Sequence, residues 1–278
     1  MKKIIDDKKQ KLGMMFKQYA NHIHINGLEN IPKMGNTIFL VNHNCFLDIY
    51  LIAYVLNKPC ISMVSANSLF GSNNERKDKL NELLYPFPVE TRAKAHYTDV
   101  CLDGAIKLLK SGKDLIIFPQ GVFDEKGKIS KARTGAIRIL FEALNEKKEN
   151  YRLIPIALSI SNINENNIQS SNIWNDFEAT ISILPKFDYT SYYEDYKKFS
   201  SPEERRIILH HLVDDIMKEI ANKLKCEYID KYKPLYYMDG FWFPDGKYIK
   251  FEDSQDEKLY NKYKEMINSI VERYINNI

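Results

Sequence analysis

A short apolar run that ends in two polar residues constrains the fold of this chain more than any other feature. Residues 37–41, Thr-Ile-Phe-Leu-Val, have the length and the β-branched content of a buried strand. Asn42 and His43 follow at once, and a helical pattern of apolar residues begins within a few positions. The sequence therefore predicts a strand that delivers His43 to the start of a helix.

Asp48 is placed to act on His43. Four residues separate the two, so a helix that begins near Cys45 turns the carboxylate back toward the imidazole. A carboxylate can fix one histidine tautomer and leave the other ring nitrogen free to take a proton. The pair is typical of a catalytic base with its orienting group. Taken alone, it is also typical of a simple helix start, in which Asn42 or His43 caps the first turn and Asp48 stabilises it electrostatically.

Two further motifs lie at the end of, or inside, apolar strand-like runs. They are Phe118-Pro119-Gln120-Gly121 and Ile154-Pro155-Ile156. Together with Asn42, His43 and Asp48, their order resembles that of the lysophospholipid acyltransferase superfamily, whose members use glycerol-phosphate acceptors. The resemblance extends from roughly residue 27 to residue 185 and includes a segment that closes on an arginine, for which Arg92 is the matching residue.

This resemblance implies transfer of a fatty acyl group from a thioester donor, acyl-CoA or acyl-ACP, to a hydroxyl of a lysophospholipid such as lysophosphatidic acid. It implies His43 as the general base and Asp48 as its orienting group, with no covalent acyl-enzyme and no cofactor or metal. An acyl carrier protein is a further candidate partner. The residues expected to bind substrate are Asn42, Arg92, Phe118, Pro119, Gln120, Gly121, Lys131, Arg133, Ile154 and Pro155.

The chain departs from the family in its central motif. The family has Phe-Pro-Glu-Gly-Thr-Arg, whereas this chain continues from Gln120 and Gly121 to Val122 and Phe123. A glutamine can donate and accept hydrogen bonds, but it cannot act as a base or pair with a cation. Loss of the arginine removes a charge-assisted contact to phosphate. We therefore expect Lys131 or Arg133 to supply the missing charge, and these replacements leave the acceptor headgroup open.

Strand-like and helix-like segments alternate along the chain with short links. Such alternation predicts an α/β fold with a mostly parallel central sheet flanked by helices. We divide the chain into an N-terminal amphipathic helix (1–20), an acyltransferase-like α/β domain (21–226) and an aromatic-rich helical C-terminal extension (227–278). The segment 68–84 is expected to be a polar loop over the site with a helix near its end. The predicted strands are 22–26, 37–41, 59–65, 114–118, 153–160 and 179–184, and the predicted helices are 46–56, 99–110, 132–148 and one that begins at Ser201.

Composition narrows the class of protein. The net charge of +3 is too small to argue for a nucleic-acid partner. The four cysteines are widely spaced, which favours a reducing cytosol over a disulfide framework or a zinc site.

No signal peptide and no apolar run of about 18 residues is evident, so no membrane-spanning helix is expected. For a lipid substrate, this predicts a cytoplasmic protein that binds the inner face of the membrane peripherally. The N-terminal helix either lies in that interface or packs on its own domain, and packing is favoured.

Two other functions are compatible with the same residues. Cys45 could be the nucleophile of a thioesterase or cysteine hydrolase, with His43 as base and Asp48 as orienting group. A lone cysteine in an apolar segment is more often a small buried side chain. Alternatively, replacement of the motif glutamate by Gln120 could leave a catalytically inactive, membrane-binding scaffold of the same fold.

Overall fold

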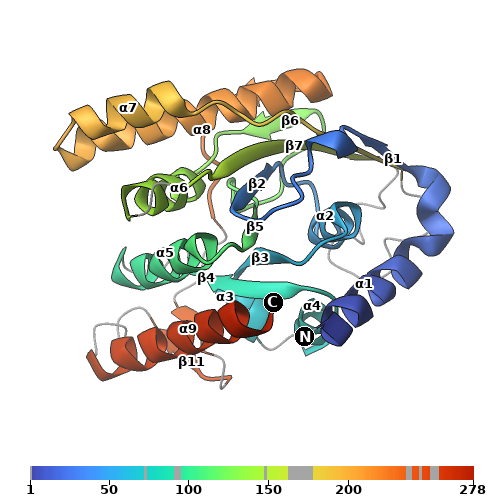
Figure 1. Ribbon diagram of the computed structural model, residues 1–278, viewed down its shortest axis with the longest axis horizontal. Helices are drawn as coiled ribbons and strands as arrows, with labels where there is room; N and C mark the ends of the chain where they lie inside the picture. Colours follow the sequence, from blue (N-terminus) through green and yellow to red (C-terminus); the bar gives the residue numbers. More distant parts are fainter. Residues whose placement is uncertain are drawn as a thin grey trace.

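A computed structural model describes residues 2–71, 74–90, 95–146, 149–161, 178–235, 240–243, 246–250 and 257–278. In these ranges one sheet has seven strands (Figure 1). They are β1 (Ile23–Asn26), β2 (Thr37–Val41), β3 (Cys60–Ser65), β4 (Tyr85–Val89), β5 (Asp114–Ile117), β7 (Arg152–Ser161) and β8 (Glu178–Ile183).

The sheet has the strand order β1-β8-β7-β2-β5-β3-β4. Five of the six neighbouring pairs are parallel, and only β7 and β8 run antiparallel. The predicted α/β fold with a mostly parallel sheet is therefore confirmed. β2, the strand that leads to His43, lies at the centre of the sheet between β7 and β5.

Helices cover both faces of this sheet (Figure 1). The alternating side chains of β2 divide between the two layers, because Ile38 and Leu40 join one core and Phe39 and Val41 join the other. Burial on both faces explains why the strand is apolar throughout. One layer contains α1 (Lys2–Phe16), α2 (Asp48–Leu56) and α4 (Asn74–Leu83), and the other contains α5 (Ala95–Lys110), α6 (Gly135–Glu146), α7 (Thr190–Lys198), α8 (Pro202–Leu224) and α9 (Glu257–Asn277).

Two segments between β3 and α5 differ from the prediction. α3 (Ala66–Phe70) and α4 are helices in a stretch where the sequence predicted mainly a polar loop. α4 is polar on most of its surface and packs through Leu80 and Leu83, a stripe too narrow to stand out in the sequence. β4 is a strand despite Pro86 and Pro88, because it lies at the sheet edge, where a missing N–H costs little.

The first helix is anchored to the domain. Leu12 and Phe16 of α1 are buried, which agrees with the packed helix that the sequence favoured, while Ile4 and Met14 are 53% and 60% exposed. Lys8 also donates hydrogen bonds to backbone carbonyls at the end of α4, including that of Leu84 at 2.8 Å.

The C-terminal residues pack on the same domain. β9 (Glu227–Ile229) pairs with β6 (Lys128–Ser130), and α9 lies along α5. β10 (Gly240–Trp242) and β11 (Tyr248–Lys250) form a hairpin whose Phe241 is fully buried and contacts the ring of Tyr263. The division at residues 20 and 226 stays a prediction. Across the described ranges, none of the helices combines the length and the apolar character needed to span a bilayer.

Candidate functional site

The fold brings two of the sequence motifs together at the carboxyl ends of neighbouring strands. β2 and β5 are parallel partners with Leu40 opposite Ile117, so the residues that follow them leave the sheet side by side. The rings of His43 and Phe118 consequently stack, with centroids 4.4 Å apart and planes inclined by 29°. This edge of the sheet is the candidate site.

His43 and Asp48 form a hydrogen-bonded pair. The distance from His43 Nδ1 to Asp48 Oδ2 is 2.9 Å, and the carboxylate is fully buried while the histidine side chain is 18% exposed. Because a carboxylate only accepts, Nδ1 must donate, which leaves Nε2 as the basic nitrogen. In the described part of the chain Nε2 makes no hydrogen bond. The structure thus brings together the two residues predicted as catalytic.

The backbone before α2 holds the carboxylate in place. Asp48 Oδ2 also accepts hydrogen bonds from the backbone N–H groups of Asn44 and Cys45, the latter at 3.0 Å. Asp48 is the first residue of α2, where the positive end of the helix dipole stabilises a negative charge. Of the helix start that the sequence offered as an alternative, the acidic residue in the first turn is present and coexists with the His43–Asp48 pair. The predicted cap is not, because the N-cap residue is Leu47, without a side-chain cap hydrogen bond, and Asn42 binds the backbone of Leu158.

Asn42 and Asn44 tie this loop to β7. The side chain of Asn42 donates to the carbonyl of Leu158 at 2.8 Å and accepts from the Leu158 N–H at 2.8 Å. Asn44 donates to the same carbonyl at 3.0 Å. Asn42 is fully buried, so the structure places it where it positions His43 through the backbone. Its predicted contact with substrate stays a prediction.

A polar network fixes the turn that carries the Phe-Pro-Gln-Gly motif. Gln120 Nε2 donates to Asp124 Oδ2 at 2.7 Å, and Asp124 Oδ1 accepts from Ser130 Oγ at 2.5 Å. The Asp124 N–H donates to the carbonyl of His43 at 2.7 Å, which links the turn to the loop that carries His43. Gly121 allows the turn because its φ of +73° is in the left-handed region. Burial raises the pKa of the Asp124 carboxyl.

Gln120 is not an exposed group in this turn. Its side chain is 2% exposed, and its Oε1 atom is buried and accepts no hydrogen bond from the described residues. Pro119, beside it, is also buried. The glutamine therefore organises the turn through Asp124 and has an unused acceptor atom.

Phe123, which stands where the motif of the resembled family has an arginine, lies against the ring of His43. Its ring meets that of His43 edge-on, with centroids 4.5 Å apart and planes at 72°. Phe118 and Phe123 therefore contact the imidazole on two sides, and the histidine side chain is left 18% exposed.

The predicted cations have different surroundings. Arg92 lies outside the described residues. Lys131 is engaged by two carboxylates, Asp230 at 2.6 Å and Asp214 at 3.2 Å, and is not available to a phosphate without breaking them. Arg133 is bound to the motif through its backbone, because its N–H donates to the Pro119 carbonyl at 2.9 Å.

The side chain of Arg133 lies beside Gly121. A Cβ built on that glycine would be 3.9 Å from Arg133 Nε, a buried atom without a partner in the described chain. The guanidinium covers the ring of Tyr232 at 5.4 Å, and burial lowers its pKa. Of the two cations named as replacements, the structure brings Arg133 to the motif.

One cation beside the site was missed from the sequence. Lys233 donates from Nζ to the carbonyl of Phe123 at 3.1 Å. It lies 110 positions after that residue in a segment without a recognisable motif, so only the folded chain reveals the contact.

Ile154 and Pro155 lie inside the sheet. They belong to β7, in register with Phe39 and Leu40 of β2, and both are buried. Their predicted contact with substrate stays a prediction.

Cys45 is poorly suited to nucleophilic attack. Its side chain is fully buried, and its Sγ lies 3.3 Å from Asp48 Oδ1. Burial, reinforced by the Asp48 carboxylate, raises the pKa of the thiol well above its usual value. Reactive cysteines instead have a lowered pKa and are partly exposed.

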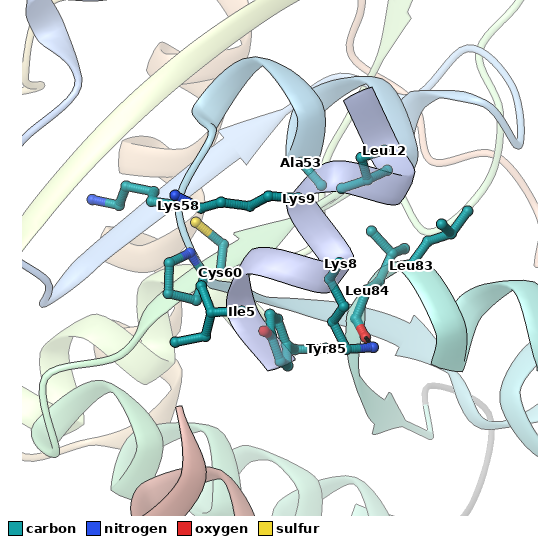
Figure 2. A pocket seen from close by; sticks show the side chains of 11 residues that line it. Ile5, Lys8, Lys9, Leu12, Ala53, Lys58, Cys60, Leu83, Leu84 and Tyr85 are labelled. Atoms are coloured by element: carbon teal, nitrogen blue, oxygen red, sulfur yellow. Dashed lines mark hydrogen bonds between the residues drawn. The ribbon is translucent and has the colours of Figure 1, made fainter. Parts of the chain in front are cut away.

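Two other features lie away from His43. A groove of about 310 Å³, including its open mouth, lies between α1 and α4 at the amino ends of β3 and β4, the opposite edge of the sheet (Figure 2). On β1, His22 and His24 both contact Glu178, at 2.8 Å and 3.3 Å. The described ranges contain no cluster of three or more side chains suited to a metal ion.

Part of this chain is similar to known proteins. Residues 22–159 match the Acyltransferase family model. The chain is 25% identical over 147 residues to the chloroplastic 1-acyl-sn-glycerol-3-phosphate acyltransferase LPAT1 of Arabidopsis thaliana, which covers 49% of this chain and 35% of that protein. The chain thus spans about a third of that curated relative. The crystal structure of the 1-acyl-sn-glycerophosphate acyltransferase PlsC from Thermotoga maritima is similar at 22% identity, with a TM-score of 0.44 over 78% of each chain.

Proposed function

Because residues 22–159 of this chain belong to the acyltransferase family, we propose that the protein transfers a fatty acyl group from a thioester donor to a hydroxyl of a lysophospholipid such as lysophosphatidic acid. The observation that carries this proposal is the 2.9 Å hydrogen bond between His43 Nδ1 and the buried carboxylate of Asp48. It supports an imidazole that donates from Nδ1 to the carboxylate, so that Nε2 is the nitrogen that takes the proton.

The reaction proceeds in two steps without an acyl-enzyme. His43 Nε2 takes the proton of the acceptor hydroxyl as its oxygen attacks the thioester carbonyl, and Asp48 stabilises the imidazolium that forms. The tetrahedral intermediate then collapses with cleavage of the carbon–sulfur bond. The thiolate leaves with the proton from the imidazolium, so the enzyme returns to its starting state.

Backbone N–H groups of the motif turn are suited to hold the oxyanion. The N–H groups of Asn44 and Cys45 are engaged by Asp48, and that of Gly121 donates to the Phe118 carbonyl at 3.2 Å. Those of Val122 and Phe123, in the same turn, donate to no described group. We assign the oxyanion to these two, since preorganised backbone donors contribute strongly to acyl transfer.

Gln120 supports the site without taking part in proton transfer. An amide cannot act as a base. Its hydrogen bond to Asp124 holds the turn that presses Phe123 against His43. Replacement of the motif glutamate is therefore compatible with turnover.

The donor is acyl-CoA or acyl-ACP, and no cofactor is required by this mechanism. The acceptor is a membrane lipid, so we place the protein on the cytoplasmic inner face of the membrane as a peripheral protein. The exposed Ile4 and Met14 of α1 support contact with such a surface.

A direct test is to incubate the purified protein with liposomes, acyl-CoA or acyl-ACP, and a panel of lysophospholipids. We expect His43-dependent formation of a diacyl product. Release of free fatty acid that requires Cys45 would favour the hydrolase, and liposome binding without any His43-dependent transfer would favour the scaffold.

A further inference from the structure

The chain segment 230–235 covers the motif turn with a second cation. Lys233 Nζ donates to the Phe123 carbonyl at 3.1 Å, and the Phe123 ring contacts that of His43 at 4.5 Å. Phe123 therefore lies between the ammonium of Lys233 and the imidazole of His43. Leu235 belongs to the same segment and lies against Gly121, since a Cβ built there would be 3.5 Å from Leu235 Cδ2.

Lys233 and Arg133 are held together. Arg133 Nη2 contacts the carbonyl of Lys233 at 3.4 Å, and the Arg133 guanidinium covers the neighbouring Tyr232 ring. Lys233 lies on the Phe123 side of the turn and Arg133 on the Gly121 side. The two positive charges thus flank the motif turn, although they come from parts of the chain 100 positions apart.

The ion pair that Lys233 makes can be exchanged at little cost. Its carboxylate partner is Glu125 at 3.4 Å, whose side chain is 62% exposed and also binds Lys128 at 3.1 Å. Exposed pairs of this kind contribute little stability. By contrast, Lys131 is committed to two carboxylates at shorter distances. Lys233 is therefore the lysine best placed to give up its partner to a phosphate.

Unused polar atoms lie on the same turn. Gln120 Oε1 and Arg133 Nε are both buried and have no hydrogen-bond partner in the described chain. Buried polar atoms without partners are uncommon and are often completed by a ligand or by water. An acceptor with a phosphate and a hydroxyl provides both the anion and the donor that these atoms lack.

From these contacts we infer that Lys233, with Arg133, binds the anionic phosphate of the acceptor lipid beside His43. The assignment rests on the proposed function for the identity of the acceptor. It makes Lys233 a specificity-determining residue supplied from beyond the segment that matches the family, and it supplies the charge that is absent at position 123.

Equilibrium binding measurements test the role of Lys233 in phosphate binding without turnover. The probes are lysophosphatidic acid, the monoacylglycerol with the same chain, and inorganic phosphate, each added to the full-length protein without a donor. We expect Lys233→Met to weaken binding of lysophosphatidic acid by about tenfold to a hundredfold, and binding of monoacylglycerol hardly at all. Lys233→Arg should retain most of the affinity, and inorganic phosphate should displace lysophosphatidic acid only at far higher concentration.

Lys128→Met is the matched control. It removes one positive charge and one contact to Glu125 but none to Phe123, so it should leave all three affinities close to wild type. Equal effects of the two methionine variants, or equal affinity of the wild type for the phosphate-bearing and phosphate-free lipids, would overturn the inference. Free phosphate binding as tightly as lysophosphatidic acid would overturn the assignment to a lipid.

Experiments can reject the phosphate-binding role of Lys233 and the proposed function independently of each other. Lys233-dependent binding in a protein that transfers no acyl group would reject the function and keep the anion site. Vigorous acyl transfer that Lys233→Met and Lys128→Met affect equally would reject the anion site and keep the function. Circular dichroism and thermal unfolding of each variant establish that it is folded before either comparison is made.

Discussion

Replacing Asp48 by Asn separates the charge of this residue from its role in holding the loop. The backbone N–H groups of Asn44 and Cys45 both donate to Oδ2. They will orient the amide so that its oxygen takes the Oδ2 position, because the amide nitrogen there would face two donors. The loop and the hydrogen bond to His43 can therefore survive, whereas the negative charge is lost.

The size of the effect follows from the geometry. With Nδ1 and Oδ2 2.9 Å apart, the centres of the two charges are about 4 Å apart, which corresponds to about 4 kcal/mol at an effective dielectric constant near 20. This attraction exists only when the imidazole is protonated, as in the transition state. We therefore expect kcat to fall by about a thousandfold, with a smaller change in acceptor binding.

The assay is the initial rate of diacyl product formation at saturating thioester and lysolipid. Thermal unfolding of the same preparation checks that the variant is folded. A folded Asp48→Asn variant that retains kcat within about tenfold of the wild type would refute the electrostatic role. In that case the carboxylate would serve only as the first residue of α2.

Three further predictions follow from particular contacts. Gln120→Glu places a second carboxylate beside Asp124, at the site of a 2.7 Å hydrogen bond. The folded state must then hold a proton between the two carboxylates, which the unfolded chain does not need. The free energy of unfolding of this variant should therefore fall as the pH rises from about 5 to 8. Cys45→Ala should retain most of the acyltransferase activity and lose about 1 kcal/mol of stability, since Cys45 is a buried side chain. Burial lowers the pKa of Lys8 from 10.5 to about 8. Between these two pH values only the unfolded chain keeps the Lys8 proton, so the stability of the wild type relative to Lys8→Met should increase as the pH rises from about 8 to 10.5.

Denaturant unfolding at several pH values measures the first and third of these, and steady-state kinetics measures the second. Equal stability of Gln120→Glu at pH 5 and pH 8 would show that the two carboxylates do not share a proton. A loss of activity in Cys45→Ala as deep as that in His43→Ala would favour the hydrolase. A stability difference between wild type and Lys8→Met that does not change with pH above about 8 would mean that burial does not lower the pKa of Lys8.

The strand before His43 was predictable because burial on both faces demands an unbroken apolar run. The proximity of Asp48 to His43 was predictable from helix geometry. The sequence could not show which of Lys131 and Arg133 lies at the motif turn, because both follow the motif closely along the chain. Only tertiary contacts separate them, since Asp214 and Asp230 come from distant parts of the chain to engage Lys131.

The remaining differences have local causes. β4 escaped prediction because its two prolines argue against a strand unless the edge position is known. The hydrogen bonds between Asn42 and the backbone of Leu158 were not predicted, because the pairing of β2 with β7 brings these residues together from distant parts of the chain. The contact between Lys233 and Phe123 depends on the path of the chain after β9, for which no motif gives a signal.

The measurement that bears most directly on this account is the rate of phosphatidic acid formation from an acyl thioester and lysophosphatidic acid by His43→Ala, relative to the wild type. Removal of the base, with Asp48 still bound by the amides of its loop, should lower kcat by at least about a thousandfold in a folded protein. A folded His43→Ala variant that transfers the acyl group at a rate near that of the wild type would contradict the account.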